Sequence, residues 1–461
     1  MNDRIDSAKV TNRSFSIYYL TFTIIVITMY IISYTSDNDY SELYNFEGIL
    51  IFCLSLYILI CSIDSIRKRG INACNLFFGV FYLCLMVNTF NISLLQQPKT
   101  LIDLYFYFTG PLLFGLFLHI GEKANRLRNI KLKFPSILDT RVTAAILLFA
   151  YYALSVYTFF TVGIKLFHSQ SLGYNRAVND NLFVIPGISG IVNTLFYCLL
   201  IYSSHVKRGY RYVIIISIFT ISGLLDFSRG NIMRIFIFIF VGYAYSQRER
   251  LVTRRNIRRA IISILVILAA FVILGNFRQH SNSFYFNINT YLLGKTNNEF
   301  INWIFGYVAL SFDTLKLTIA EPPTKTLSAL MMTIHRLFGN YPKVVEYLEV
   351  FRNRNLGSTF NSSTFLSPFI SDMGVYYFIE VIIVGIVYGM LISICKTYRL
   401  KGVYYYILVL IVLTVFGNYL VNYQYTLPLI IILPLLCSKS NPIQIALPEF
   451  IYNLVLRVSS R

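Results

Sequence analysis

The sequence predicts an all-α polytopic integral membrane protein with about twelve transmembrane helices. Hydrophobic residues make up 56% of its 461 residues and charged residues only 13%, against about 25% in an average soluble domain. The mean hydropathy is +0.61. A soluble fold of this length could not bury so much apolar surface. The apolar residues also gather in runs long enough to cross a bilayer, which takes about 20 residues.

These runs divide the chain into three parts. The candidate spans are 15–34, 46–66, 71–95, 102–121, 142–163, 181–203, 211–226, 230–246, 260–275, 370–395, 403–421 and 423–438. Residues 1–275 hold the first nine spans, 276–369 form a large loop, and 370–461 hold the last three spans and a tail. The segment before the first run is polar and mixed in charge, so we expect no cleavable signal peptide.

The distribution of basic residues predicts the orientation of the spans. With the N-terminus in the cytoplasm, 27 of the 40 Lys and Arg residues fall on the cytoplasmic side. The short outer loops hold only Lys99, Lys165, Arg176 and Arg229. This is the positive-inside rule, and it predicts that both termini are cytoplasmic. It also accounts for most of the +19 net charge, so we expect the bases to contact membrane lipids and not nucleic acid.

The 276–369 loop is then outside the membrane. Residues 299–320 are apolar enough for a thirteenth span, but one more crossing would put the basic residues 396–401 on the wrong side. We therefore interpret 299–320 as an interfacial or re-entrant helix, with a second amphipathic helix near 326–351. The two prolines of 321–323 separate these helices.

Common enzyme and metal signatures are absent from the sequence. The seven cysteines lie in or beside apolar runs without CxxC spacing, and the five histidines are widely separated. We therefore expect no disulfide framework, no thiol chemistry and no metal site. There is also no phosphate-binding glycine loop with a lysine, no HExxH and no GxSxG.

Arginines on the outer side are the first candidates for function, because the topology rule does not require them there. Arg229 lies in the tight hairpin 226–231, and Arg234 follows about one turn into the next span. Ionisable groups at this depth are costly and usually functional. The alternatives are an Asp226–Arg229 pair that caps two helices, or snorkelling to headgroups. Arg176 is either a ligand for substrate or a solvated loop charge.

The large loop carries further candidates. Arg278 follows the ninth span directly, His335 and Arg336 lie within the predicted second helix, and Arg352 and Arg354 lie near its end. All could bind an anionic substrate, and for all of them binding to anionic lipid is the alternative.

Asp372 is placed at the outer boundary of the tenth span, after the hydroxyl- and amide-rich run 357–368. A partly desolvated carboxylate there could act as a general base, and an N-cap is the equal alternative. The loop also holds aromatic residues such as Trp303 and Tyr307, which suit sugar rings or simply pack the loop helices.

Three features together resemble one known family. Residues 227–231 are similar to a Ser-Arg-Gly hairpin, and Asn361, Thr364, Pro368 and Asp372 to Gly374 are similar to a polar stretch that ends in Asp-x-Gly. Arg176 and Gly187 are separated by ten residues, although no arginine of the large loop repeats this spacing. With the order of the spans over nearly the whole chain, these features resemble the bacterial O-antigen polymerases, which polymerise oligosaccharide repeat units.

The resemblance implies a metal-independent, cofactor-free glycosyltransferase of the lipid-phosphosugar-dependent (GT-C-like) membrane type. It would act at the periplasmic face of the inner membrane on undecaprenyl-diphosphate-linked oligosaccharides, with a polysaccharide chain-length regulator as a partner. Arg229 would hold the diphosphate, and Asp372 or His335 would be the base. The residues expected to bind substrate are Arg176, Arg234, Arg278, Arg336, Arg352 and Arg354.

Two other functions stay open. An O-antigen ligase uses the same donor but transfers the glycan to a lipid A core. A lipid-linked oligosaccharide flippase belongs to a different class, and transporters commonly use inverted repeats and broken helices at the midplane. The chain has no internal repeat, its midplane positions are nearly free of charge, and transport does not need a loop as long as 276–369.

Overall fold

The computed structural model describes residues 46–90, 93–123, 129–132, 140–162, 188–224, 229–246, 298–320, 363–437 and 443–446, with single positions at 258, 262, 265, 269, 273, 323 and 330. The predicted first span, 15–34, therefore lies outside the described residues. Of the predicted ninth span and of the helix 326–351, only isolated positions are described.

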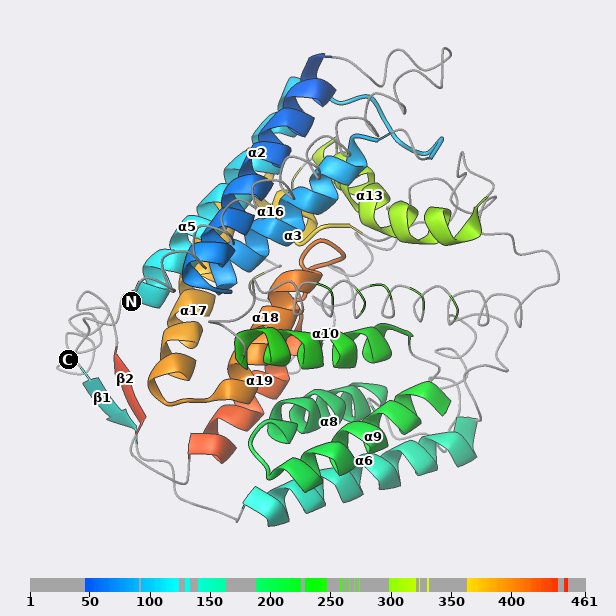
Figure 1. Ribbon diagram of the computed structural model, residues 1–461, viewed down its shortest axis with the longest axis vertical. Coiled ribbons are helices and arrows are strands. Elements are labelled where there is room, and N and C mark those ends of the chain that lie inside the picture. Colours follow the sequence, from blue (N-terminus) through cyan, green and yellow to red (C-terminus); the bar gives the residue numbers. More distant parts are fainter. Residues whose placement is uncertain are drawn as a thin grey trace, which may run out of the picture.

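The described chain is helical (Figure 1). Its helices are α2 (Phe46–Arg69), α3 (Ala73–Asn88), α4 (Leu101–Leu104), η2 (Tyr105–Thr109), α5 (Gly110–Lys123), α6 (Thr140–Val162), α8 (Ile188–Ser203), α9 (Arg208–Leu224), α10 (Arg229–Ser246), α13 (Glu299–Ile319), α16 (Leu366–Met373), η4 (Gly374–Tyr376), α17 (Phe378–Thr397), α18 (Lys401–Leu413) and α19 (Tyr423–Cys437). The strands β1 (Asn129–Leu132) and β2 (Ile443–Ala446) pair antiparallel, which the all-α prediction did not include.

Four described helices are long and apolar enough to cross a membrane: Phe46–Lys68, Leu101–Lys123, Val142–Thr161 and Phe378–Thr397. Large apolar side chains also point outward, and Phe149 and Phe160 of α6 are 76% and 79% exposed. Apolar surface on this scale is typical of a face that contacts lipid. The helical membrane character is therefore as predicted, whereas the twelve-span topology stays a prediction.

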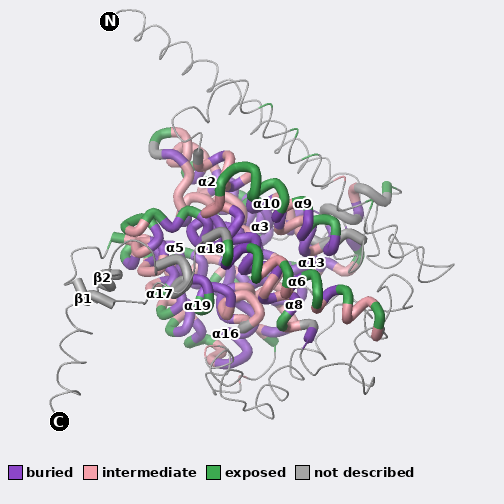
Figure 2. Tube along the Cα trace, turned by 90° about the horizontal axis from the view of Figure 1, so that it is seen from below, coloured by how far each residue is buried: buried purple, intermediate pink, exposed green. Residues whose placement is uncertain are grey.

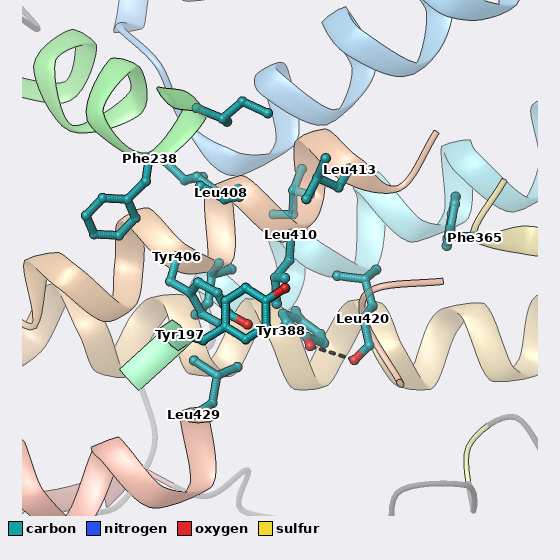
Figure 3. Close-up of a cluster of buried hydrophobic side chains, with 14 of the residues drawn as sticks. Tyr197, Phe238, Phe365, Tyr388, Tyr406, Leu408, Leu410, Leu413, Leu420 and Leu429 are labelled. Carbon is teal, nitrogen blue, oxygen red and sulfur yellow. Dashed lines mark hydrogen bonds between the residues drawn. The ribbon is translucent and has the colours of Figure 1, made fainter. Parts of the chain in front are cut away.

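The core forms around α18, which packs against α3, α8, α10 and α17. Nearly every residue of α18 is buried, and Figure 2 shows the buried residues gathered at the centre of the molecule. In Figure 3, Tyr406, Leu408 and Leu410 of α18 lie beside Tyr197 of α8 and Leu429 of α19. A helix that is apolar all round is expected in such a central position.

Helices α5 and α17 approach each other most closely through glycines. A Cβ atom on Gly389 would collide with the carbonyl oxygen of Leu118, and one on Gly121 would lie 2.6 Å from the carbonyl oxygen of Ile386. Gly385 and Gly389 form a GxxxG pattern on α17. In lipid, the acyl chains are as apolar as the helix surfaces, so the hydrophobic effect does not drive helices together. Helices associate there by close packing of small residues.

Three predicted spans are shorter or more broken than expected. The span 71–95 is helical only over Ala73–Asn88. The span 370–395 is not one helix, because α16 ends at Met373 and its C-cap Gly374 has a φ of 56°, in the left-handed region. A Cβ atom there would also lie 3.0 Å from Cγ of Pro323. The span 403–421 is helical only to Leu413, and residues 414–422 connect α18 to α19. The side chain of Asn418 stabilises this connection by accepting the Val421 N–H at 3.3 Å.

Contacts between distant segments sort into two ends of the molecule. At one end Lys396 pairs with Glu122, and β1 pairs with β2. At the other end Thr318 bonds to Ser367, and the Tyr105 hydroxyl donates to the carbonyl of Val375 at 2.8 Å. The positive-inside rule predicts the same side of the membrane for both partners of each pair. Which end faces the cytoplasm stays a prediction.

His205 connects α8 to α18 at the first of these ends. The Gly402 N–H donates to its Nε2 atom at 3.2 Å, so the neutral ring is the form that fits. Burial, followed by the nearby charges of Arg211 and Lys401, lowers the pKa of His205 from 6.5 to about 4. In the unfolded chain the ring takes up a proton near its ordinary pKa, whereas in the folded protein it does so only near the lowered pKa.

Gly389→Ala should destabilise the protein by about 1–3 kcal/mol, since the new methyl group forces α5 and α17 apart. Gly190→Ala is the matched control, because nothing lies within 4 Å of a Cβ atom at that helical glycine. It should be neutral or slightly stabilising. Thermal unfolding in one detergent compares the two variants, and equal melting temperatures would contradict the close contact.

Thermal stability should fall as the pH is lowered from about 6.5 towards about 4, because only the unfolded state protonates His205 in this window. In His205→Gln the amide oxygen can still accept the Gly402 N–H, but the side chain does not titrate. The variant should therefore lose this part of the pH dependence. Identical melting curves against pH for both proteins would rule out the assignment.

Candidate functional site

The described residues include some of the predicted site residues. Asp372 and Arg234 are fully described, and Arg229 is the first residue of α10, although its side chain is not described. The other predicted residues lie outside the described part of the chain: Arg176, Arg278, His335, Arg336, Arg352 and Arg354. The candidate site therefore consists of Arg234, Asp372 and the described residues around them.

Arg234 lies in a cage of three tyrosines. Its guanidinium carbon is 5.2 Å, 5.3 Å and 5.8 Å from the ring centroids of Tyr425, Tyr419 and Tyr197. Nη1 donates to the side-chain oxygen of Asn231 at 2.9 Å, and Nη2 donates to the Tyr425 hydroxyl at 3.2 Å. Ring faces stabilise a desolvated cation, so the cage lets the charge stay inside the protein.

The same guanidinium keeps unused donor capacity. Nε of Arg234 is buried and has no hydrogen-bond partner in the structure. The side chain folds back along α10, because a Cβ atom on Gly230 would lie 3.3 Å from its Nη1. This places a cation in the first turn of a helix, where the helix dipole already favours negative charge. The arrangement therefore suits an anion such as a phosphate oxygen.

Asp372 lies in the last turn of α16 and is 1% exposed. The N-cap alternative is wrong, since α17 begins at Phe378 and its capping residue Tyr377 makes no side-chain capping bond. The prediction of partial desolvation understated the burial. Glu380, in the first turn of α17, is fully buried as well, and it was not among the residues predicted from the sequence. Its signal was present, because Glu380 is the only charged residue between Phe378 and Cys395.

The connection between α18 and α19 links these two centres. At its start, the carbonyl of Thr414 accepts the N–H of Phe365 at 2.7 Å, which holds the residue before α16. Tyr419 near its end and Tyr425 in the first turn of α19 form two walls of the arginine cage. The Tyr388 hydroxyl of α17 donates to the carbonyl of Leu420 at 2.6 Å and so fixes this connection to α17. The connection therefore contacts both the residue before α16, the helix that carries Asp372, and the cage around Arg234.

A tyrosine inserted into a helix supports the same region. The Gly110 N–H donates to the Tyr377 hydroxyl at 2.7 Å, and this hydroxyl donates to the carbonyl of Phe106 at 3.2 Å. In a regular α-helix these two backbone groups would bond to each other. The hydroxyl replaces that bond beside the π-helical turn η2, a type of bulge that is frequent at functional sites.

A buried ion pair fixes α13 to the segment before α4. Lys99 and Asp313 are 4% and 0% exposed, and Nζ of Lys99 lies 2.9 Å from a carboxylate oxygen of Asp313. The carboxylate also accepts from the side chain of Asn88 at 2.6 Å and from the N–H of Gln97 at 3.2 Å. Removing a partner from such a pair costs about 3–5 kcal/mol.

A second pair lies beside the first. Lys316 of α13 bonds to Asp103 at 3.2 Å and to the carbonyl of Pro98. From the sequence, Lys99 was predicted only as a base of an outer loop, and Asp103, Asp313 and Lys316 had no predicted role. As predicted, 299–320 contains a helix, and the described contacts bind it to residues of one end of the molecule. Its non-spanning position stays a prediction.

Within the described residues, no group of three or more His, Cys, Asp or Glu could hold a metal ion. No protein-family model, curated protein or solved structure matches the chain.

Asp313→Asn should lower the free energy of unfolding by about 3–5 kcal/mol, because it leaves the Lys99 charge buried without its counter-ion. Asp64→Asn is the control, since Asp64 pairs with Lys68 on an exposed helix surface, where such pairs contribute about 0.3–0.5 kcal/mol. Denaturation of both variants in one detergent measures the difference. Replacing both partners by apolar residues should recover part of the loss, and equal losses for the two single variants would contradict the buried pair.

Proposed function

We propose that the chain is a membrane glycosyltransferase that polymerises undecaprenyl-diphosphate-linked oligosaccharide repeat units into a surface polysaccharide at the periplasmic face. The observation that carries the proposal is the caged guanidinium of Arg234, which has a buried donor left over at the start of α10. The buried carboxylate of Asp372 supports it, because Asp372 lies on α16 and the residue before α16 bonds to the start of the α18–α19 connection.

Arg234 would stabilise the leaving group. When a diphosphate leaves a sugar carbon, its oxygens gain negative charge, and a guanidinium can donate to them through a planar fork. Each charge-assisted hydrogen bond contributes roughly 1.5–3 kcal/mol. The positive end of α10 adds to this stabilisation, because its first backbone N–H groups also point towards the anion. Arg229, as the first residue of α10, stays the second candidate for this role.

Asp372 would act on the acceptor. The hydroxyl that attacks the sugar carbon must lose its proton, and a carboxylate close to it can accept that proton as a general base. The transition state would have oxocarbenium-ion character at the sugar, as in other glycosyl transfers. His335 stays the alternative base and lies outside the described residues.

The tyrosines give the site a surface that suits carbohydrate. Tyr419 and Tyr425 are partly exposed and pack edge to face at 4.7 Å beside the guanidinium, whereas Tyr197 is buried. Aromatic rings with hydroxyl groups offer both an apolar face and a hydrogen-bonding edge. A sugar ring needs this combination, because it presents both C–H faces and hydroxyls.

Arg234→Lys should reduce the yield of polymer on the order of a hundredfold, because lysine keeps the charge but loses the fork that makes two charge-assisted hydrogen bonds. Arg208→Lys is the matched control, since Arg208 is exposed and stacks over Tyr212 where α9 begins. Purified variants in vesicles with the lipid-linked repeat unit give the yield and the product lengths.

Wild-type product lengths for Arg234→Lys would contradict the role of Arg234. Transfer of single units to a lipid A core acceptor, without growth of the lipid-linked chain, would identify a ligase. Movement of the lipid-linked unit across the vesicle without formation of a glycosidic bond would identify a flippase.

A further inference from the structure

Asn231 is a buried polar side chain that holds the guanidinium of Arg234. It is 4% exposed, and its Oδ1 atom accepts from Nη1 of Arg234 at 2.9 Å. The two residues lie three positions apart on α10, so they share one face of the helix. The second acceptor for the guanidinium is the Tyr425 hydroxyl at 3.2 Å. An amide oxygen and a phenol hydroxyl are both uncharged, so neither acceptor neutralises the cation.

Arg234 differs in this respect from other cations of the structure. Lys99, Lys316 and Lys396 each pair with a carboxylate. Within the described part of the chain, none of the ion pairs includes Arg234. Its charge is stabilised by the ring faces of the three tyrosines of the cage. Arg234 therefore keeps a positive charge that none of the described carboxylates cancels.

Helix stability by itself would favour an aspartate at position 231. This position lies in the first turn of α10, where the helix dipole favours negative side chains. A carboxylate three residues before an arginine would also add an ion pair along the helix. Asparagine forgoes both contributions. A local choice that lowers stability in this way is typical of a functional site, where another requirement decides the residue.

We propose that Asn231 is a positioning residue that makes the site specific for a diphosphate, because its neutral amide holds the Arg234 guanidinium without cancelling the charge. A carboxylate at this position would accept the same hydrogen bond, but it would compete with a bound anion for the guanidinium. Asn231 thus acts on the anion through Arg234. This role rests on the proposed function and specifies how the same site recognises the diphosphate of the lipid-linked donor.

Asn231→Asp separates the charge from the hydrogen bond, because the two side chains have nearly the same size and shape. Full-length protein in vesicles of phosphatidylcholine is titrated with inorganic pyrophosphate, and the rise in melting temperature gives the affinity. Without pyrophosphate the variant should melt above the wild-type protein, since aspartate adds the two contributions that asparagine forgoes. Its affinity for pyrophosphate should nevertheless fall about tenfold or more, because the guanidinium is already paired.

Asn72→Asp is the matched control. Oδ1 of Asn72 caps α3 by accepting the Asn75 N–H at 2.8 Å, and an aspartate caps a helix equally well. The control makes the same chemical change on another helix, so it should keep the wild-type affinity for pyrophosphate.

Asn231→Ala removes the acceptor without adding a charge, so its affinity should fall by less than that of Asn231→Asp. If Asn231 only held the first turn of α10 together, the order would reverse, because aspartate keeps the hydrogen bond and alanine loses it. The reversed order, or the wild-type affinity in either variant, would overturn the proposal. If Asn231→Asp does not fold, the wild-type affinity in Asn231→Ala would still overturn it.

A lipid headgroup also carries phosphate, so glycerol 3-phosphate is titrated in parallel as its soluble equivalent. It should bind more weakly than pyrophosphate, and equal affinities with the same dependence on Asn231 would overturn the specificity for a diphosphate. These measurements fail separately from the polymerisation assay. If pyrophosphate binding depends on Asn231 in a protein that makes no polymer, the diphosphate site stands and only the polymerisation is refuted.

Discussion

In an apolar interior every charge and every backbone polar group has to find its partner within the protein, and this requirement organises one end of the molecule. The carboxylate of Asp313 pairs with Lys99 and accepts hydrogen bonds from the Asn88 side chain and the Gln97 N–H. These bonds fix α13 to the segment before α4. Thr318 near the end of α13 bonds to Ser367 at 2.7 Å and so holds α16. Asp372 lies on α16. The Lys99–Asp313 ion pair therefore helps to position Asp372, through α13 and its bond to α16.

Helical breaks supply the irregular backbone that a site needs. Gly374 separates α16 from α17, η2 interrupts the 101–123 helix, and residues 414–422 interrupt what reads as one span. Non-helical backbone at membrane depth is tolerated only where protein covers it. Here the hydroxyls of Tyr105, Tyr377 and Tyr388 and the side chain of Asn418 bond to backbone groups at these breaks, so each break is stabilised by a polar side chain.

Much of the helical pattern could be predicted, because long apolar runs have few other uses. The expected span 142–163 is helix α6 at 140–162, and 46–66 is α2 at 46–69. The break at Gly374 was missed because an isolated glycine within an apolar run does not by itself show where a helix ends. Arg234 was identified from its depth, but its three tyrosines come from separate segments, and no local pattern brings them together. The pairing of Lys99 with Asp313 could not be predicted for the same reason, because the two residues lie far apart in the sequence.

The distance along the chain between Lys99 and Asp313 has a consequence for biosynthesis. Their separation of 214 residues means that the lysine is made long before its counter-ion. At roughly 5–20 residues per second, translation takes roughly 10–40 s to reach the aspartate. A charged lysine cannot wait in the bilayer, so its loop stays in water or among headgroups until α13 is made. This end of the molecule is therefore assembled late, after most of the helices that surround it are already in the membrane.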